Sequence, residues 1–371
     1  MGKMLIPALL STLLATMVAG TAGAAAPAAD QPVRYTIKNG ETLIGLATRY
    51  MLRPDDYRSV QTLNKVADPY KIPAGTVLLF PERLLRTEPI AGRVASFRGS
   101  VSVDGRNAAL GMPIHQGTHV QTGENAFVTI ELPDRSTISL PSQSRIQVEQ
   151  LRRILLTGAL DRNFRLEAGR STSSVTPSKA TSPTFRVTTP LSVSAVRGTE
   201  FRVALDPSGA RAATEVVGGT VGVAGAAGGD EVSVPRGFGI FVTPAGVGAP
   251  VALLPWPKLE RIAREGTDGV VITIGAVEGA TSYRTELAND LQFKQVFAEK
   301  VTAAPSASFG GMLGIRFYVR LTAIAESGLE GRSRIYALDR SGRGIPQPSD
   351  DDISIYGRPD STAVAPRSSI H

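Results

Sequence analysis

The sequence predicts a multidomain fold in which a small α+β unit of β-α-α-β order is followed by mainly-β domains. The length of 371 residues exceeds what a single domain of typical size holds. Between residues 33 and 81 the apolar positions change from a two-residue period to a helical period, and then to a short apolar run. From residue 89 onward, short alternating runs are separated by Gly, Pro and Asp, which is typical of antiparallel sheets.

The N-terminal segment has the pattern of a secretory signal peptide. Lys3 supplies a positive charge, Leu5–Ala19 is apolar, and Ala22–Ala24 offers a small-residue cleavage site. The apolar part is about 15 residues long, whereas a membrane span needs about 20, so an uncleaved anchor is the less favoured alternative. We expect a cleaved signal peptide at 1–24, a spacer at 25–32 and a mature chain that is periplasmic or cell-wall associated.

The composition excludes several classes of chemistry. The chain has no Cys, which excludes disulfides, thiol nucleophiles and Cys-ligated metals. His115 and His119 are four residues apart in a segment expected to be strand or loop, where their side chains would not converge on a metal ion. We therefore expect no metal and no cofactor. The formal charge of +7 is scattered, without a basic run, so we expect no nucleic-acid partner.

Residues 33–81 predict two strands around two helices. Val33, Tyr35 and Ile37 alternate with polar residues, and Asn39-Gly40 then turns the chain. The first helix is indicated by apolar residues with helical spacing, namely Leu43, Leu46, Ala47 and Tyr50. A second helix opens at Pro54 and ends at Asn64, and Val77–Phe80 forms the second strand before Pro81.

This unit resembles a LysM domain. The matching residues are Tyr35–Leu43, Ala47, Tyr50, Leu63-Asn64, Pro73–Leu78 and Pro81. The resemblance implies binding of N-acetylglucosamine-containing glycans, chiefly peptidoglycan, in a shallow groove between the loop after the first strand and the loop before the second. Carried over onto this sequence, the groove residues are Gly40, Glu41, Thr42, Leu43, Asp68, Ile72 and Pro73. The chain departs from the family at two positions, with Glu41 in place of the usual Asp and Ile44 in place of a common aromatic.

Residues 89–250 predict an all-β domain, either a sandwich, a barrel or a β-helix. The segment resembles a FecR-type domain through six stretches in order: Gly99–Val101, Gly117–Gly123, Leu132–Ser136, Phe185–Pro190, Val196–Phe201 and Gly218–Val221. In the namesake family this domain is periplasmic and relays a signal from an outer-membrane receptor to a cytoplasmic sigma factor. Because almost no chain precedes the apolar segment, we do not expect the sigma-factor connection, and the resemblance implies a protein-interaction or sensory module. Within the segment, Ser171–Thr184 is rich in Ser, Thr and Pro and is expected to be a flexible loop.

Residues 253–340 predict a third unit of strands. Val270–Ile274 and Phe317–Ile324 have strand patterns, and Ser327-Gly328 forms a turn. The second of these runs resembles fibronectin type III-like sandwiches, which implies a role in spacing or protein contact. Residues 341–371 are rich in Pro, Ser and Asp and are expected to be a disordered tail.

These patterns predict a non-catalytic peptidoglycan-binding protein of the periplasm. Its FecR-type domain would contact an envelope protein partner of unknown identity. An alternative is a cell-envelope signalling component that senses a receptor or ligand. A wall hydrolase is a third possibility, because a glycosidase needs only two carboxylates, but Glu131, Asp134 and Glu200 are explained by strand and turn positions.

Overall fold

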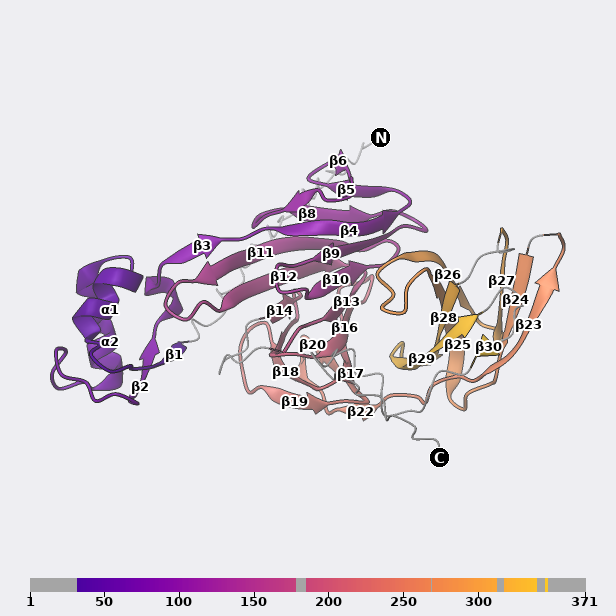
Figure 1. Cartoon of the computed structure of the whole chain (residues 1–371). Helices are drawn as coiled ribbons and strands as arrows, with labels where there is room; N and C mark the ends of the chain where they lie inside the picture. The colour runs from indigo at the N-terminus through magenta and orange to yellow at the C-terminus, as the bar shows by residue number, and fades with distance from the viewer. Residues whose placement is uncertain (1–31, 178–184, 268, 312–316, 339–343, 346–371) are drawn as a thin grey trace, which may run out of the picture.

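The computed structural model describes residues 32–177, 185–267, 269–311, 317–338 and 344–345. The expected signal peptide, residues 1–24, lies outside the described residues, as do nearly all of the spacer and most of the tail. The described chain forms three units in a row, with the helical unit at one end, a large β-sandwich in the middle and a smaller β unit at the other end (Figure 1). The predicted fold class, a small helix-plus-strand region followed by mainly-β domains, is confirmed. Within this described part of the chain, no helix is long and apolar enough to cross a membrane.

The N-terminal unit has the predicted β-α-α-β order. Its elements are β1 (Val33–Thr36), α1 (Leu43–Tyr50), the 3-10 turn η1 (Pro54–Asp56), α2 (Tyr57–Asn64) and β2 (Val77–Phe80). The two strands are antiparallel, with Val33 opposite Phe80 and Thr36 opposite Val77. Leu43, Leu46 and Ala47 bury one face of α1, as their spacing predicted.

The middle unit is a sandwich of two ten-stranded sheets. The first runs β21-β20-β17-β16-β13-β10-β9-β4-β7, with β22 beside β20. Its strands are β4 (Gly92–Arg98), β7 (Pro113–Ile114), β9 (Phe127–Glu131), β10 (Thr137–Leu140), β13 (Arg170–Ser174), β16 (Glu200–Leu205), β17 (Ala212–Gly218), β20 (Phe238–Thr243), β21 (Gly246–Val247) and β22 (Val251–Ala252).

The second sheet runs β19-β18-β15-β14-β12-β11-β8-β5-β6, with β3 beside β11. Its strands are β3 (Thr87–Pro89), β5 (Val101–Val103), β6 (Arg106–Asn107), β8 (His119–Thr122), β11 (Arg145–Ile154), β12 (Leu160–Ala168), β14 (Phe185–Thr188), β15 (Ser192–Val196), β18 (Thr220–Gly225) and β19 (Val232–Pro235). One apolar core fills the space between the sheets, and it includes the contacting rings of Phe164, Phe185 and Phe201. Of the architectures left open by the sequence, the structure is therefore a sandwich.

One expected loop is partly a strand. The Ser-rich segment expected to be flexible begins with β13, which pairs with β10 on one side and β16 on the other. Ser171 and Ser173 are buried at its alternate positions, so small polar side chains occupy places where apolar residues usually signal a strand. Residues 178–184 of the expected loop lie outside the described chain.

The C-terminal unit consists of two smaller sheets around their own core. One sheet is β23-β24-β27 and the other is β26-β25-β28-β29-β30. The strands are β23 (Leu259–Glu265), β24 (Gly269–Ile274), β25 (Ala280–Ala288), β26 (Val296–Thr302), β27 (Ser306–Phe309), β28 (Phe317–Ala325), β29 (Glu330–Leu338) and β30 (Gly344–Ile345). The expected disordered tail needs correction at β30, because these two residues pair with Ala337 and Leu338 on the edge of the sheet.

The β11–β12 hairpin connects the helical unit to the sandwich. Ile154 and Leu156, at the tip of this hairpin, are buried in the core of the helical unit together with Met51 and Leu85. Backbone hydrogen bonds also join the hairpin to the chain that leaves the helical unit. The Leu155 amide donates to the Arg86 carbonyl oxygen at 3.1 Å, and β3 pairs with β11. The helical unit therefore does not complete its core with its own residues alone.

A charged cluster lies at the same junction. Glu82, in the 3-10 turn η2 (Glu82–Leu84), is 2.6 Å from a guanidinium nitrogen of Arg152, and Arg152 also contacts Asp161 at 2.8 Å. Arg186 contacts the other oxygen of Asp161 at 2.7 Å. Burial, together with the neighbouring Asp161, raises the pKa of Glu82 to about 7, although Arg186 and Arg152 oppose this shift.

The sandwich and the C-terminal unit share a buried ion-pair network centred on Glu330. Glu330 is 2% exposed and accepts hydrogen bonds from Arg202 at 3.1 Å and Arg284 at 2.7 Å, and it also pairs with Arg170. Its backbone amide donates to Glu215 at 2.7 Å. Burial alone would raise the pKa of Glu330, but the three guanidinium groups outweigh it and hold that pKa well below its ordinary value.

We predict that Ile154→Ala lowers the free energy of unfolding by about 2–5 kcal/mol, because it leaves a cavity inside the helical unit. Ile154 is 4% exposed, whereas its neighbour Leu155 is 40% exposed and provides a matched control. Leu155→Ala should cost less than about 1 kcal/mol. Urea denaturation of the full chain measures both. Equal losses in the two variants would contradict the shared core.

We also predict that Glu82→Gln flattens the dependence of stability on pH between 4.5 and 7. A carboxyl whose pKa rises from 4.5 to about 7 on folding stabilises the folded state when protonated, and this contribution is lost as pH rises through that window. Gln keeps a hydrogen-bond acceptor for Arg152 without the buried charge, so the variant should be more stable than the parent at pH 8. Denaturation from pH 4 to 8 tests this, with Glu88→Gln, which removes an exposed carboxylate, as the control. If the free energy of unfolding changed with pH in the same way for the parent, Glu82→Gln and Glu88→Gln, the prediction would be wrong.

Candidate functional site

The structure brings the two predicted groove loops together. The amide of Leu43 donates to the carbonyl oxygen of Pro69 at 2.9 Å, which joins the start of α1 to the loop before β2. Gly40, Glu41 and Thr42 therefore lie on one loop, and Asp68, Ile72 and Pro73 lie on the loop joined to it.

The first loop is shaped by Gly40 and Glu41. Gly40 has a φ of +79°, a conformation that favours glycine, with no atom near the position of an added side chain. The carboxylate of Glu41 accepts from the Tyr35 hydroxyl at 2.8 Å and from the Lys38 amide at 2.8 Å. Burial, followed by the hydrogen bond to Glu41, raises the pKa of Tyr35 to about 12. Glu41 thus stabilises the loop conformation through its hydrogen bonds to Tyr35 and Lys38.

Thr42 and Leu43 position the first helix. The Thr42 hydroxyl accepts from the Gly45 amide at 3.0 Å and caps α1. The side chain of Leu43 is fully buried, so this residue supports the loop from below and its side chain does not reach the surface. Both predicted groove residues therefore have structural roles that are independent of any ligand.

The second loop is a series of turns. The side chain of Asp68 accepts from the Tyr70 amide at 2.8 Å, and the Lys71 amide donates to the Asp68 carbonyl oxygen at 3.2 Å. Ile72 is half-buried and packs against the core, whereas Pro73 is exposed. Ile72 thus both supports the loop and reaches its surface.

Tyr70 is a candidate contact residue that the sequence patterns did not single out. It lies between Asp68 and Ile72, and it is 66% exposed. An exposed aromatic face suits stacking against the apolar face of a sugar ring. The available signal was its aromatic character in a loop expected to line the groove, but Tyr70 is outside the residues that match the family pattern.

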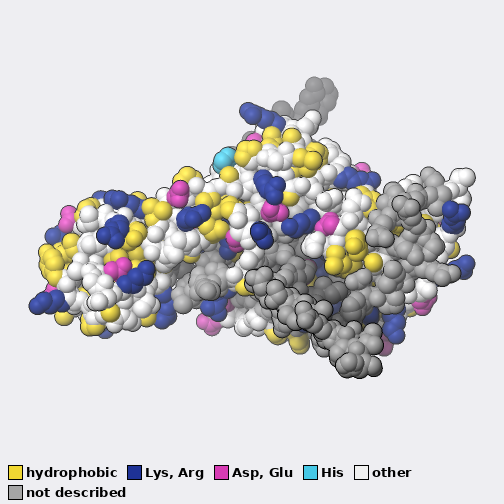
Figure 2. Space-filling model, in the orientation of Figure 1, with side chains coloured by type: hydrophobic (Ala, Val, Ile, Leu, Met, Phe, Trp, Pro, Cys, Tyr) yellow, Lys and Arg dark blue, Asp and Glu magenta, His cyan; other side chains and the backbone are white. Residues whose placement is uncertain are grey.

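The helical unit and the turn that follows it, residues 33–86, have a basic surface. The segment contains nine Lys and Arg residues against five Asp and Glu residues, and all nine basic residues are exposed. Figure 2 shows several of these basic side chains on the end of the molecule formed by this unit. Each acidic side chain has a partner nearby: Glu41 with Tyr35, Asp55 with Arg58, Asp56 with Arg53, Asp68 with the Tyr70 amide and Glu82 with Arg152. The surface of this unit therefore favours anionic polymers.

The histidine pair does not form a metal centre. His119 is half-exposed and lies 3.9 Å from Asp104 and 4.0 Å from Glu167, while the His115 amide donates to Thr118. Throughout the residues that the structure describes, no group of three or more possible ligands could hold a metal ion.

Comparisons with known proteins give a family match in each of the first two units. Residues 35–81 match the LysM domain family, and residues 118–222 match the family described as FecR protein. No curated protein matches the sequence. Domains of these two families are typically non-catalytic binding or signalling modules.

Three solved structures show distant likenesses to this chain. Two crystal structures of a candidate anti-sigma factor from Parabacteroides distasonis ATCC 8503 are 17% identical, with TM-scores of 0.29 and 0.30. Each match covers 36% of this chain and 59% of the other, so this chain spans less than two thirds of that protein. The FN1–FN3 domains of chicken CNTN1 are 10% identical over 68% of this chain and 99% of the other, with a TM-score of 0.20. TM-scores this low do not establish a shared fold.

From the two family matches, the chain carries a LysM domain followed by a FecR domain within the central sandwich.

Proposed function

We propose that this protein is a non-catalytic envelope protein that is retained on peptidoglycan by its LysM domain. The observation that carries the proposal is the pair of loops joined by the Leu43–Pro69 hydrogen bond, with Tyr70 exposed beside them. In this proposal the groove residues are those predicted from the family, with Tyr70 added. The secreted, periplasmic or wall-associated location belongs to the same proposal, as does the cleaved signal peptide.

The roles of the groove residues differ in kind. Glu41, Thr42 and Leu43 set the loop conformation through their own hydrogen bonds and burial, while Gly40 allows the turn. The ligand would contact the backbone of this loop, the exposed Pro73 and the Tyr70 ring. A single shallow groove of this kind binds weakly, so retention on the wall would depend on further contacts.

The β-rich remainder is proposed to contact another envelope protein. The Glu330 network joins the sandwich to the C-terminal unit, so a partner would meet these two units as one surface. We propose that the C-terminal unit is a fibronectin type III-like sandwich that acts as a spacer or a second contact surface. Its two sheets and separate core support this assignment.

A second candidate function is envelope signalling. The FecR family match favours it, because the central sandwich could sense a receptor or ligand and pass its state to a partner. In that case wall binding would only localise the sensor. The function itself would be the passing of a signal to the partner.

We predict that Tyr70→Ala weakens co-sedimentation of the full chain with purified peptidoglycan by about 5- to 30-fold, as expected for removal of a contacting aromatic anchor. Leu110→Ala removes a 70% exposed side chain from the central unit and should leave binding unchanged. The supernatant is analysed for released sugars and peptides in the same experiment.

Point variants are preferable to deletion of residues 33–81, because deletion would expose Ile154 and Leu156. Failure of the parent chain to pellet would overturn the wall-binding proposal and favour signalling. Binding that is identical in Tyr70→Ala and the parent would remove the groove assignment. Release of fragments would indicate a hydrolase.

A further inference from the structure

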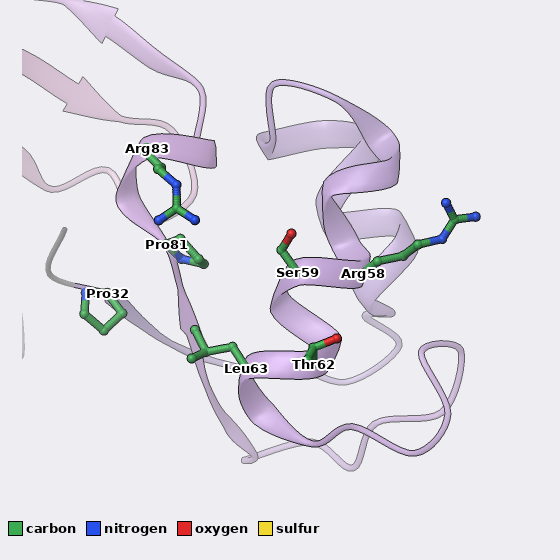
Figure 3. Close-up of a pocket in the computed structure, with 7 residues that line it drawn as sticks. All are labelled: Pro32, Arg58, Ser59, Thr62, Leu63, Pro81 and Arg83. Carbon is green, nitrogen blue, oxygen red and sulfur yellow. The ribbon is translucent and has the colours of Figure 1, made fainter.

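A pocket lies at the end of the LysM domain opposite the proposed groove. The groove loops adjoin the Thr36–Val77 end of the two-stranded sheet, whereas the pocket adjoins the Val33–Phe80 end. Its lining comes from α2, from the residue just before β1 and from the chain after β2. It consists of Pro32, Arg58, Ser59, Thr62, Leu63, Pro81 and Arg83 (Figure 3). The pocket is therefore separate from the predicted groove residues.

The lining combines an apolar floor with a cation and hydroxyl groups. Leu63 is 47% exposed and points toward Pro81 and Pro32 (Figure 3). Arg83 lies above Pro81, and the Ser59 hydroxyl is on the side of α2 that faces Arg83. A carboxylate could pair with the guanidinium of Arg83 while a small apolar side chain covers Leu63.

The two arginines of the lining differ in direction. The guanidinium of Arg58 points away from the other lining residues (Figure 3). It lies over the Tyr57 ring and 3.8 Å from Asp55, so it belongs to the outer face of α2. Arg83 is therefore the cation of the pocket that we test. Arg49, which is exposed on α1 and belongs neither to the pocket lining nor to the groove residues, provides the matched charge control.

We propose that this pocket is a second wall-binding site, which takes the carboxylate-bearing end of a peptidoglycan stem peptide. The inference rests on the proposed wall-binding function and names a second ligand group for it. The charge on the domain agrees with this ligand, because most of its exposed charged side chains are basic and stem peptides carry free carboxylates. Small apolar side chains of such a peptide would suit the floor formed by Leu63 and the two prolines.

A second site strengthens retention by adding a contact at the other end of the domain. Once one site holds the wall, the other binds at a raised effective concentration of its own ligand. The pocket alone can therefore be weak and still change the affinity for intact peptidoglycan. Removing the peptides from the wall should abolish this contribution and leave the glycan groove unaffected.

The test compares Arg83→Gln with Arg49→Gln in the full chain, on intact peptidoglycan and on the same material stripped of stem peptides by an amidase. Both variants change the net charge equally. We expect Arg83→Gln to weaken binding to intact peptidoglycan about tenfold and Arg49→Gln to weaken it less than twofold. On stripped glycan, the two variants should bind like the parent. Leu63→Asp, which places a carboxylate at the floor, should reproduce the effect of Arg83→Gln.

Several outcomes would overturn the second site. Equal losses in both arginine variants would show unspecific charge attraction, and an equal loss for Arg83→Gln on stripped glycan would exclude the peptide as its ligand. Tyr70→Ala separates the two proposals, because it should weaken binding to both materials. If the parent binds neither material, the wall-binding function itself fails. Thermal denaturation of each variant checks that the fold is intact.

Discussion

The pairing of β11 with β12 is the constraint on which the arrangement of the first two units depends. These strands are 10 and 9 residues long, and they are neighbours near the middle of the second sheet of the sandwich. At the tip of the same hairpin, Ile154 and Leu156 are buried in the LysM core. A change in the register of this pair would therefore alter the sandwich and withdraw apolar side chains from the core of the LysM unit.

At its other end, the sandwich is joined to the C-terminal unit mainly by buried ion pairs, with a smaller apolar contact beside them. Glu330 is surrounded by Arg170, Arg202 and Arg284, which come from both units. Removing charges from water is costly, so such a network is stable only when its members keep their partners. Phe127 adds an apolar contact with Phe293 and Val296 at the same boundary. The network thus favours one relative position of the two units over any that separates the charges.

Local patterns allowed the LysM elements to be predicted from the sequence almost residue by residue. Leu43–Tyr50 is helical and Val77–Phe80 is a strand, as their periodicity indicated, because each pattern is set by neighbouring residues. The coupling between units could not be predicted in this way. Nothing in the local sequence around Ile154 or Glu330 indicates the contacts that these residues make with another unit. The same holds for the candidate sites. The groove loops were predicted from local sequence, whereas the pocket could not be predicted because Arg83 and α2 come together only in the folded chain.

A rigid connection between the LysM domain and the sandwich would change the effect of the proposed wall binding. With a flexible linker, the sandwich would sample many orientations, and ordering them would oppose the binding of a partner that also contacts the wall. Here the chain between the LysM domain and the sandwich is paired into the second sheet through β3, and Arg152 connects Glu82 to Asp161 across the junction. In the proposed function, the orientation of the sandwich relative to a glycan in the groove would therefore be set before any partner binds. Contact with the wall at both ends of the LysM domain would extend that fixed orientation to the peptidoglycan strand itself.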